Sequence, residues 1–176
     1  MDTQQFWDLI EEARRPAPDD AGAVVRHATA LLAGRPRQDV IAAQQILWDL
    51  MAHSYRGDLW GAAYLINGGC SDDGFDYFRG WLVTQGRAAF ERAVAAPDSL
   101  AGLPAVRAAA GNGEELDCED ALGIAWDAHL AATGEQMSGD CYTIAYPEIV
   151  FTWDFDDAGE TARRLPHLAA LYDGER

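Results

Sequence analysis

Apolar side chains recur with the spacing of an α-helix along most of this 176-residue chain, and proline or glycine interrupts the pattern at short intervals. In residues 3–14, for example, Phe6, Leu9 and Ile10 fall on one helical face, and Pro16 follows. This spacing indicates amphipathic helices that end where proline removes a backbone donor. The sequence therefore predicts a mainly α fold, a single compact helical domain over residues 1–176.

Similar stripes and end signals occur along the rest of the chain. Asn67-Gly68-Gly69 is typical of a left-handed helix cap, and Ser71 followed by two acids is typical of a helix start. Residues 98–116 are rich in Ala, Gly and Pro and predict short turns with little regular structure. The further helices expected are 20–33, 36–56, 58–66, 71–86, 87–96, 118–133 and a short C-terminal helix interrupted or restarted at Pro166.

The pattern changes after residue 134. Ile149, Phe151, Trp153 and Phe155 alternate with other residues, and a period of two is typical of a strand. Residues 141–146 form a candidate partner segment. We therefore expect a small strand-like segment near residues 141–155 within a variable C-terminal part, 135–176.

The charge of the chain excludes several classes of function. All 13 cationic residues are arginine, 29 residues are acidic, and the formal net charge is −16. Such a surface repels phosphate backbones and anionic lipids, so we expect neither nucleic-acid nor membrane binding. A protein, a peptide or a small molecule remains as the partner. Without lysine, Schiff-base and P-loop chemistry are excluded, and the Ala-, Gly- and Arg-rich composition suggests a high-GC bacterial genome.

Cysteine usage and the N-terminus indicate a cytoplasmic location. The three cysteines are odd in number and form no Cys-x-x-Cys pair, which argues against a disulfide framework and a zinc-thiolate site. The first residues carry no basic region followed by an apolar run, so no signal peptide is expected. The four histidines show no metal spacing either, and we expect no metal and no cofactor.

The sharpest polar cluster lies where a helix is expected to start. Asp72, Asp73, Asp76 and Arg79 fall close together on that helix, and Asp76 and Arg79 have the i, i+3 spacing of an ion pair. These residues could bind a ligand or carry acid–base chemistry, with Arg79 holding an anionic group. The alternative is helix capping and a surface ion pair, because acidic first turns also suit the helix dipole.

Other candidate residues flank this cluster. Trp60 and Tyr64 form an aromatic i, i+4 pair just before it. Cys70 precedes a helix N-terminus, where thiolates are stabilised, although a small buried cysteine is the simpler interpretation. His53 and Gln85, near the two ends of the segment, are accessory candidates.

The central stretch resembles a known bacterial family, the domain of unknown function 4240, over roughly residues 3–130. The resemblance implies a helical fold, with a family-like core and a less similar tail. It brings no activity, cofactor or catalytic residue. The residues that carry it are Phe6-Trp7, Leu59 to Phe75, Phe78 to Leu82, Gln85 to Arg87, and Pro97 to Leu100.

Two classes of function follow from these observations. The first is a non-catalytic accessory or binding protein with a polar and aromatic groove around residues 58–86. The second is a small enzyme that uses Asp and Arg, with His as an accessory, for acid–base or metal-assisted chemistry in the same segment. A deep pocket where Asp73, Arg79 and His53 converge would favour the enzyme.

Overall fold

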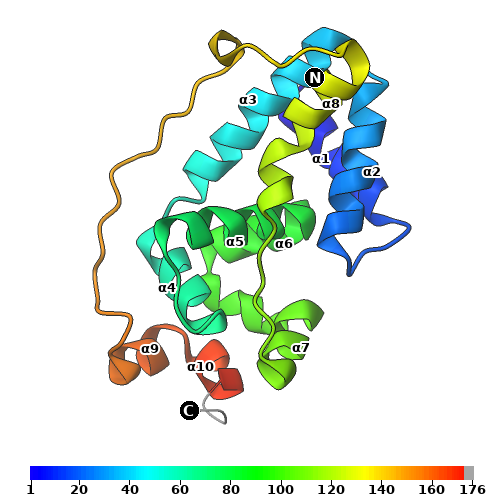
Figure 1. Ribbon diagram of the computed structural model, residues 1–176. Helices are drawn as coiled ribbons and strands as arrows, with labels where there is room; N and C mark the ends of the chain where they lie inside the picture. The colour runs from blue at the N-terminus through cyan, green and yellow to red at the C-terminus, as the bar shows by residue number, and fades with distance from the viewer. Residues whose placement is uncertain (173–176) are drawn as a thin grey trace.

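The computed structural model describes residues 1–172, and these are mainly helical, as the sequence predicts. One group of helices packs together at the end of the molecule that holds the N-terminus, drawn at the upper right of Figure 1. Because α8 packs against α2 and α3, the group is closed by a helix from late in the chain. Its members are α1 (Thr3–Arg14), α2 (Ala21–Ala33), α3 (Arg37–His53) and α8 (Ile124–Thr133).

A second group of helices forms the lower part of Figure 1 and ends with the last helix of the chain. The final helix, α10, packs on α4, α9 and η1, so the C-terminal part returns to the middle of the sequence. The members are α4 (Gly57–Ile66), α5 (Asp72–Thr84), α6 (Arg87–Ala95), η1 (Pro97–Gly102), α7 (Pro104–Asn112), η2 (Glu119–Gly123), α9 (Ala158–Arg164) and α10 (Pro166–Tyr172). The short η3 (Gly139–Cys141) lies apart from them, at the top of Figure 1.

The apolar stripes found in the sequence form the core. Phe6 and Ile10 of α1 and Phe75 and Phe78 of α5 are almost completely buried. Burial of such side chains contributes about 1.5–3 kcal/mol each. The stripes of the early helices thus become a shared interior without any disulfide, because all three cysteines are free.

The predicted turn between α4 and α5 is confirmed. Gly68 and Gly69 both have positive φ, and the Gly69 amide donates to the Tyr64 carbonyl at 2.9 Å. Ser71 is then the N-cap of α5, and its hydroxyl accepts a hydrogen bond from the Gly74 amide at 3.1 Å. Two adjacent glycines permit this backbone path, which reverses the chain between the two helices.

Two predictions about the middle of the chain were wrong. Residues 98–116 were expected to be irregular, but they form η1 and α7, which starts with Pro104 in its first turn and ends at the left-handed Gly113. Half of the eight residues between these signals are Ala, which gives a weak apolar stripe but a high helix propensity. The helix expected over 118–133 begins as the short η2, and only α8 continues as an α-helix.

The predicted strand-like segment is absent, since residues 1–172 contain no β-strand. Residues 142–157, hereafter the strap, instead run without regular secondary structure from η3 to α9, drawn as the long orange trace in Figure 1. The strap is extended over most of its length and ends in a turn, in which the Asp157 amide donates to the Asp154 carbonyl at 3.1 Å. Ile149, Trp153 and Phe155 are partly buried while their neighbours are exposed. The alternation therefore reports an extended chain with one side against the body, which needs no partner strand.

Candidate functional site

Arg79 lies in the interior, on the third turn of α5, with 0% of its surface exposed. Its Nε donates to the Phe75 carbonyl at 3.3 Å, one terminal nitrogen donates to the Met51 carbonyl, and the other pairs with the Asp76 carboxylate. The ion pair predicted from the i, i+3 spacing is confirmed, but it is not on the surface. Burial of a guanidinium requires such partners, because an unpaired buried charge is very costly.

Three aromatic rings enclose the same guanidinium. Its carbon lies 4.6 Å from the ring centroid of Phe75, 5.0 Å from that of Tyr55 and 5.1 Å from that of Tyr146. Cation–π contacts of this kind are strongest where water is excluded. Arg79 is thus held on all sides by the protein itself and is not free to hold an external anion.

Burial sets the protonation behaviour beside Arg79. Burial raises the pKa of Asp76, and the neighbouring Arg79 opposes that rise. Burial likewise raises the pKa of Tyr146, again against the influence of Arg79. The Tyr146 hydroxyl lies beside both charged groups. The cluster is an enclosed ion pair capped by a phenol.

Trp60 and Tyr64 hold neighbouring segments in place. Trp60 is buried, stacks on Phe75 at 4.6 Å between ring centroids, and donates from Nε1 to the Cys70 carbonyl at 2.9 Å. The Tyr64 hydroxyl donates to the Asp156 carboxylate of the strap at 2.7 Å. The side chains of Trp60 and Tyr64 are therefore engaged by the protein itself, through the turn after α4 and through the strap.

Cys70 is not in the environment of a nucleophile. Burial raises the pKa of its thiol to about 12, with a smaller opposing effect of Arg79 and a further rise from Glu115. Since the thiolate is the reactive form, the N-terminus of α5 does not activate this residue. The structure favours the interpretation of Cys70 as a small, partly buried side chain.

We expect alkylation of Cys70 to be about a thousandfold slower in the folded protein than in urea. With a pKa of about 12, only about one thiol in ten thousand is ionised at pH 8. Peptide mapping by mass spectrometry after timed iodoacetamide treatment measures this rate. Modification of Cys70 at the rate seen in the unfolded chain would contradict the burial of its sulfur.

The accessory candidates do not join the cluster. His53 is exposed at the C-terminal end of α3, where its carbonyl accepts a hydrogen bond from Arg56 Nε at 3.2 Å. Gln85 caps the C-terminus of α5 and donates to the Thr84 hydroxyl at 3.1 Å. With Arg79 enclosed, Asp73, Arg79 and His53 do not form the pocket that would indicate an enzyme.

The acids at the start of α5 meet a second acidic segment that the sequence reasoning did not single out. Asp72 and Asp73 are exposed in the first turn of α5. Burial raises the pKa of Tyr77, and Glu119, Asp73 and Asp76 raise it further, which places these three carboxylates around one phenol. The composition of the sequence could have revealed this segment, because five of the seven residues 114–120 are acidic.

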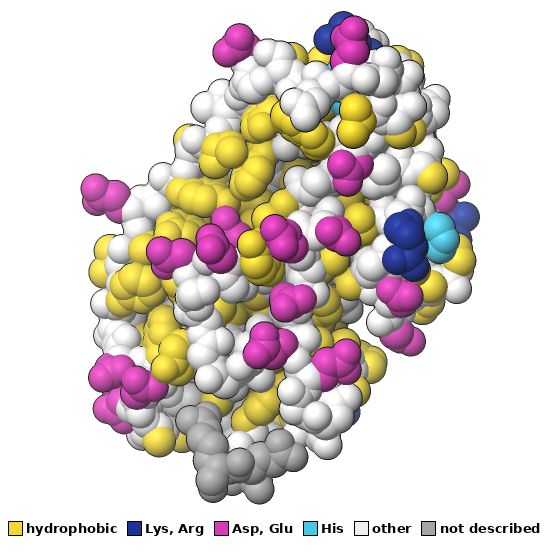
Figure 2. Space-filling view, in the orientation of Figure 1, with side chains coloured by type: hydrophobic (Ala, Val, Ile, Leu, Met, Phe, Trp, Pro, Cys, Tyr) yellow, Lys and Arg dark blue, Asp and Glu magenta, His cyan; other side chains and the backbone are white. Residues whose placement is uncertain are grey.

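Specific hydrogen bonds hold the second acidic segment against α4 and α5. The Asn67 side chain bonds the Leu116 backbone in both directions, at 3.0 and 3.2 Å, and the Cys118 amide donates to the Tyr77 carbonyl at 3.0 Å. We call the carboxylates of the two segments the acidic face, and Figure 2 shows Asp and Glu gathered in a band across the middle of this view. Its members are Asp72, Asp73, Asp76, Glu114, Glu115, Asp117, Glu119 and Asp120.

A hollow of about 600 Å³, hereafter the acidic hollow, opens beside this face between the loop before α2 and the helix α7. Its floor is apolar, and acids form its rim; among the described residues that line it none is Arg or His. Burial raises the pKa of the nearby Cys118 thiol, and the charges of Asp120, Asp117 and Asp20 raise it further. The negative potentials of these three carboxylates therefore add up at this thiol. The lining residues are Asp19, Asp20, Ala21, Trp81, Pro104, Ala105, Ala108, Glu114, Glu115, Leu116 and Asp117.

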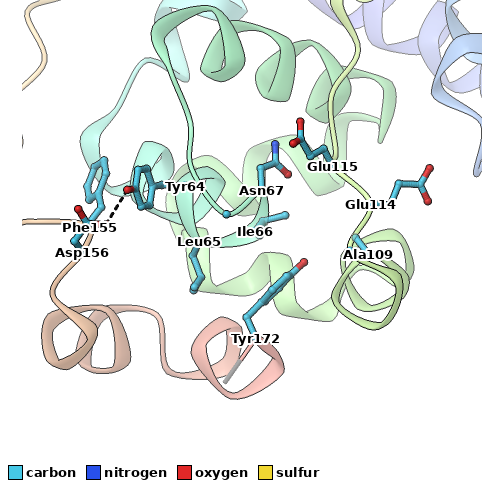
Figure 3. Close-up of a pocket in the computed structure, with 12 residues that line it drawn as sticks. Tyr64, Leu65, Ile66, Asn67, Ala109, Glu114, Glu115, Phe155, Asp156 and Tyr172 are labelled. Atoms are coloured by element: carbon cyan, nitrogen blue, oxygen red, sulfur yellow. Dashed lines mark hydrogen bonds between the residues drawn. The ribbon is translucent and has the colours of Figure 1, made fainter. Parts of the chain in front are cut away.

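A second hollow, of about 390 Å³, lies on the other side of residues 113–115. Figure 3 shows the Tyr64 hydroxyl bonded to Asp156 at one end, Tyr172 rising from α10, and the Glu114 carboxylate pointing away from the centre. The side chains that line this second hollow are therefore mostly apolar or already paired. Glu114 and Glu115 line both hollows, but they contribute their charge mainly to the acidic face.

Within residues 1–172, no three His, Cys, Asp or Glu side chains are grouped so that they could hold a metal ion. No described helix combines the length and the apolar character needed to cross a bilayer.

The fold and the site define a helical protein with an enclosed arginine, an aromatic surface covered by an extended strap, and an adjoining acidic face. The chain belongs to the family described as "protein of unknown function (DUF4240)", whose model matches residues 1–130. This confirms the resemblance found in the sequence. No curated protein and no solved structure matches the chain. Arg79 and the acidic face lie within the matched residues, and the strap lies outside them.

Proposed function

We propose that this protein is a binding module that holds a basic, partly apolar segment of another polypeptide on its acidic face and in the acidic hollow. The observation that carries the proposal is the composition of that hollow, which combines an apolar floor with a rim of carboxylates and has no cationic lining residue among those described. The binding class was one of the two expected from the sequence. The proposed binding surface differs from the groove expected around residues 58–86. It lies at the start of α5 and on residues 114–120.

Charge and apolar surface have separate roles in this proposal. A field of one sign speeds the encounter with a partner of opposite charge and excludes acidic competitors. The apolar floor includes the buried Trp81 and Leu116, and it offers apolar area whose burial slows the dissociation of a complex. A segment that alternates arginine or lysine with leucine-like residues satisfies both parts.

No observation on the described residues favours the enzyme alternative. It needs Arg79 to reach a substrate, and this side chain is enclosed by Tyr55, Phe75 and Tyr146. The nearby thiol of Cys70 is also largely protonated at neutral pH, since burial raises its pKa to about 12.

We expect a fluorescein-labelled amphipathic peptide of arginine and leucine to bind the protein. The double variant Glu115→Gln/Asp117→Asn should weaken binding about tenfold, which corresponds to about 1.4 kcal/mol. Fluorescence anisotropy at 50 and 150 mM NaCl measures both affinities, and higher salt should reduce the difference between them.

A matched control separates the acidic hollow from general charge attraction. Asp8→Asn/Glu12→Gln makes the same change in net charge on exposed residues of α1, outside the hollow. It should change the affinity less than twofold. Equal weakening by both double variants, or no binding of the peptide by the unmodified protein, would refute the proposal.

A further inference from the structure

The strap lies against the body without the backbone pairing that holds an added β-strand. Within the described chain, no backbone amide of residues 144–155 donates a hydrogen bond to another residue. Side-chain contacts therefore hold the strap, and they are made with α3, α4, α5 and the residues that join these helices. The mode differs from strand addition, in which main-chain bonds provide much of the affinity.

The strap side chains pack on aromatic rings of the body and into the space that glycines leave open. Tyr146 stacks on Tyr55 with 4.7 Å between ring centroids and an interplanar angle of 11°. A Cβ atom added at Gly61 would overlap the Trp153 ring and lie 3.0 Å from Phe155. Two residues of the body thus fit the strap closely, one through its ring and one because it has no side chain.

A second glycine and a second ring extend the fit along α4. A Cβ atom at Gly57 would lie 2.7 Å from the Val150 carbonyl oxygen, so the strap backbone approaches this helix directly. Phe151 meets the Trp60 ring edge-on, at 5.3 Å between centroids. The groove formed by Tyr55, Gly57, Trp60 and Gly61 thus receives an extended chain with aromatic side chains.

Polar contacts fix both ends of this extended chain. The Gln45 amide accepts from the Thr143 backbone N–H at 2.8 Å and donates to the Thr143 carbonyl at 3.2 Å. Asp156 accepts from the Tyr64 hydroxyl at the other end. A side-chain amide that bonds both the N–H and the C=O of one residue recognises extended backbone whatever the residue type.

The strap also has unpaired buried polar atoms and exposed apolar side chains, which are typical of a segment that detaches locally. Among the described residues, Trp153 Nε1 is buried in it without a hydrogen-bond partner, and so is Trp48 Nε1, whose ring contacts Tyr146 of the strap. Val150 and Phe151 remain 72% and 52% exposed. Unpaired buried polar atoms and exposed apolar groups both favour local detachment over global unfolding.

We propose that the groove on α3–α5 is a docking site for an extended aromatic polypeptide segment, and that the strap is its intrachain occupant, which detaches and rebinds as a unit. The groove residues lie within residues 1–130 that match the family, whereas the strap follows them. The site and its occupant thus belong to different parts of the chain. The surface is separate from the acidic hollow, so this inference does not rest on the function proposed above.

A synthetic, labelled peptide with the sequence of residues 142–157 tests the groove in the full-length chain. Wild type should bind it poorly, because the tethered strap competes at an effective concentration in the millimolar range. The variant Tyr146→Ala/Trp153→Ala, with its own strap weakened, should bind it at least tenfold more tightly. Anisotropy at about 0.3 M NaCl, which screens repulsion between two acidic molecules, measures both.

Two controls determine the outcome. Adding Gly61→Leu to the double variant fills the seat of Trp153 and should abolish binding, and a peptide with the same two alanine substitutions should not bind. Failure of the double variant to bind the unmodified peptide up to 1 mM, on the order of the tethered concentration, or binding unaffected by Gly61→Leu, would overturn the proposal.

A measurement on the unmodified protein tests detachment directly, in case the variants fold poorly. Chymotrypsin should cleave after Phe151, Trp153 or Phe155 while circular dichroism shows the helices intact. The rate should depend on urea much less steeply than global unfolding does, because only the strap opens. Cleavage with the full urea dependence of global unfolding would overturn the proposal.

Discussion

Replacing Arg79 with glutamine should lower the free energy of unfolding by about 3–5 kcal/mol, because it removes one partner of a buried ion pair. Glutamine leaves Asp76 without its counter-charge and removes the cation from between the rings of Phe75 and Tyr146. For a chain of this size, the loss corresponds to a fall in melting temperature of roughly 6–20 °C. Urea denaturation followed by circular dichroism measures the difference.

The matched control for this substitution is Arg163→Gln. Arg163 pairs with Glu160 at the same i, i+3 spacing, but its side chain is 62% exposed and that of Arg79 is 0% exposed. Exposed pairs are typically worth less than 1 kcal/mol, so this variant should be nearly as stable as wild type. Similar costs for the two substitutions would show that Arg79 is not enclosed.

The cost of Arg79→Gln should also depend on pH, through Asp76. Burial raises the pKa of Asp76, and Arg79 is the group that opposes the rise, so the variant raises this pKa further. A carboxyl with a raised pKa favours the folded state below its unfolded pKa and loses this contribution as the pH rises through the folded pKa. The difference between wild type and variant should therefore be largest near neutral pH and shrink as the solution is acidified toward pH 4.

The spacing of Asp76 and Arg79 predicts their ion pair, but the burial of the pair depends on residues far away in the sequence. Met51 accepts a hydrogen bond from Arg79 across 28 positions, and Tyr146 reaches the same guanidinium from the strap. Helical periodicity reports which residues share a face, and it carries no information about what covers that face. The expectation that Asp76 and Arg79 form a surface ion pair failed for this reason, whereas Asp72 and Asp73 are exposed.

Local signals explain why most helix bounds were predictable. Proline, glycine and serine mark the ends of α1, α4 and α5 in the sequence, and the structure places those ends within one or two residues of the expected positions. The acidic segment 114–120 could have been noticed by its composition. Its position beside α5 could not, because it depends on the bonds from Asn67 and from Cys118, which join distant segments.

The same junction between α5 and the second acidic segment provides the second large effect. Gly80 is buried on α5, and a Cβ atom there would lie 2.5 Å from the Cys118 carbonyl oxygen and 3.3 Å from the Ala121 Cβ. Gly80→Ala therefore forces a backbone segment away from the helix, against the hydrogen bond from the Cys118 amide to Tyr77. Overpacking of this kind typically costs 1–3 kcal/mol, and we expect a net loss of about 2 kcal/mol in urea denaturation.

Gly111→Ala gives the opposite sign in the same experiment. Gly111 also lies in a helix, α7, but nothing lies within 4 Å of an added Cβ atom, so alanine should stabilise the protein by up to about 1 kcal/mol through helix propensity. Stabilisation by both substitutions would contradict the close packing at Gly80. If the acidic segment must be held at α5 to bind a basic peptide, Gly80→Ala should also weaken binding of the arginine–leucine peptide at temperatures where the variant is fully folded, and Gly111→Ala should not.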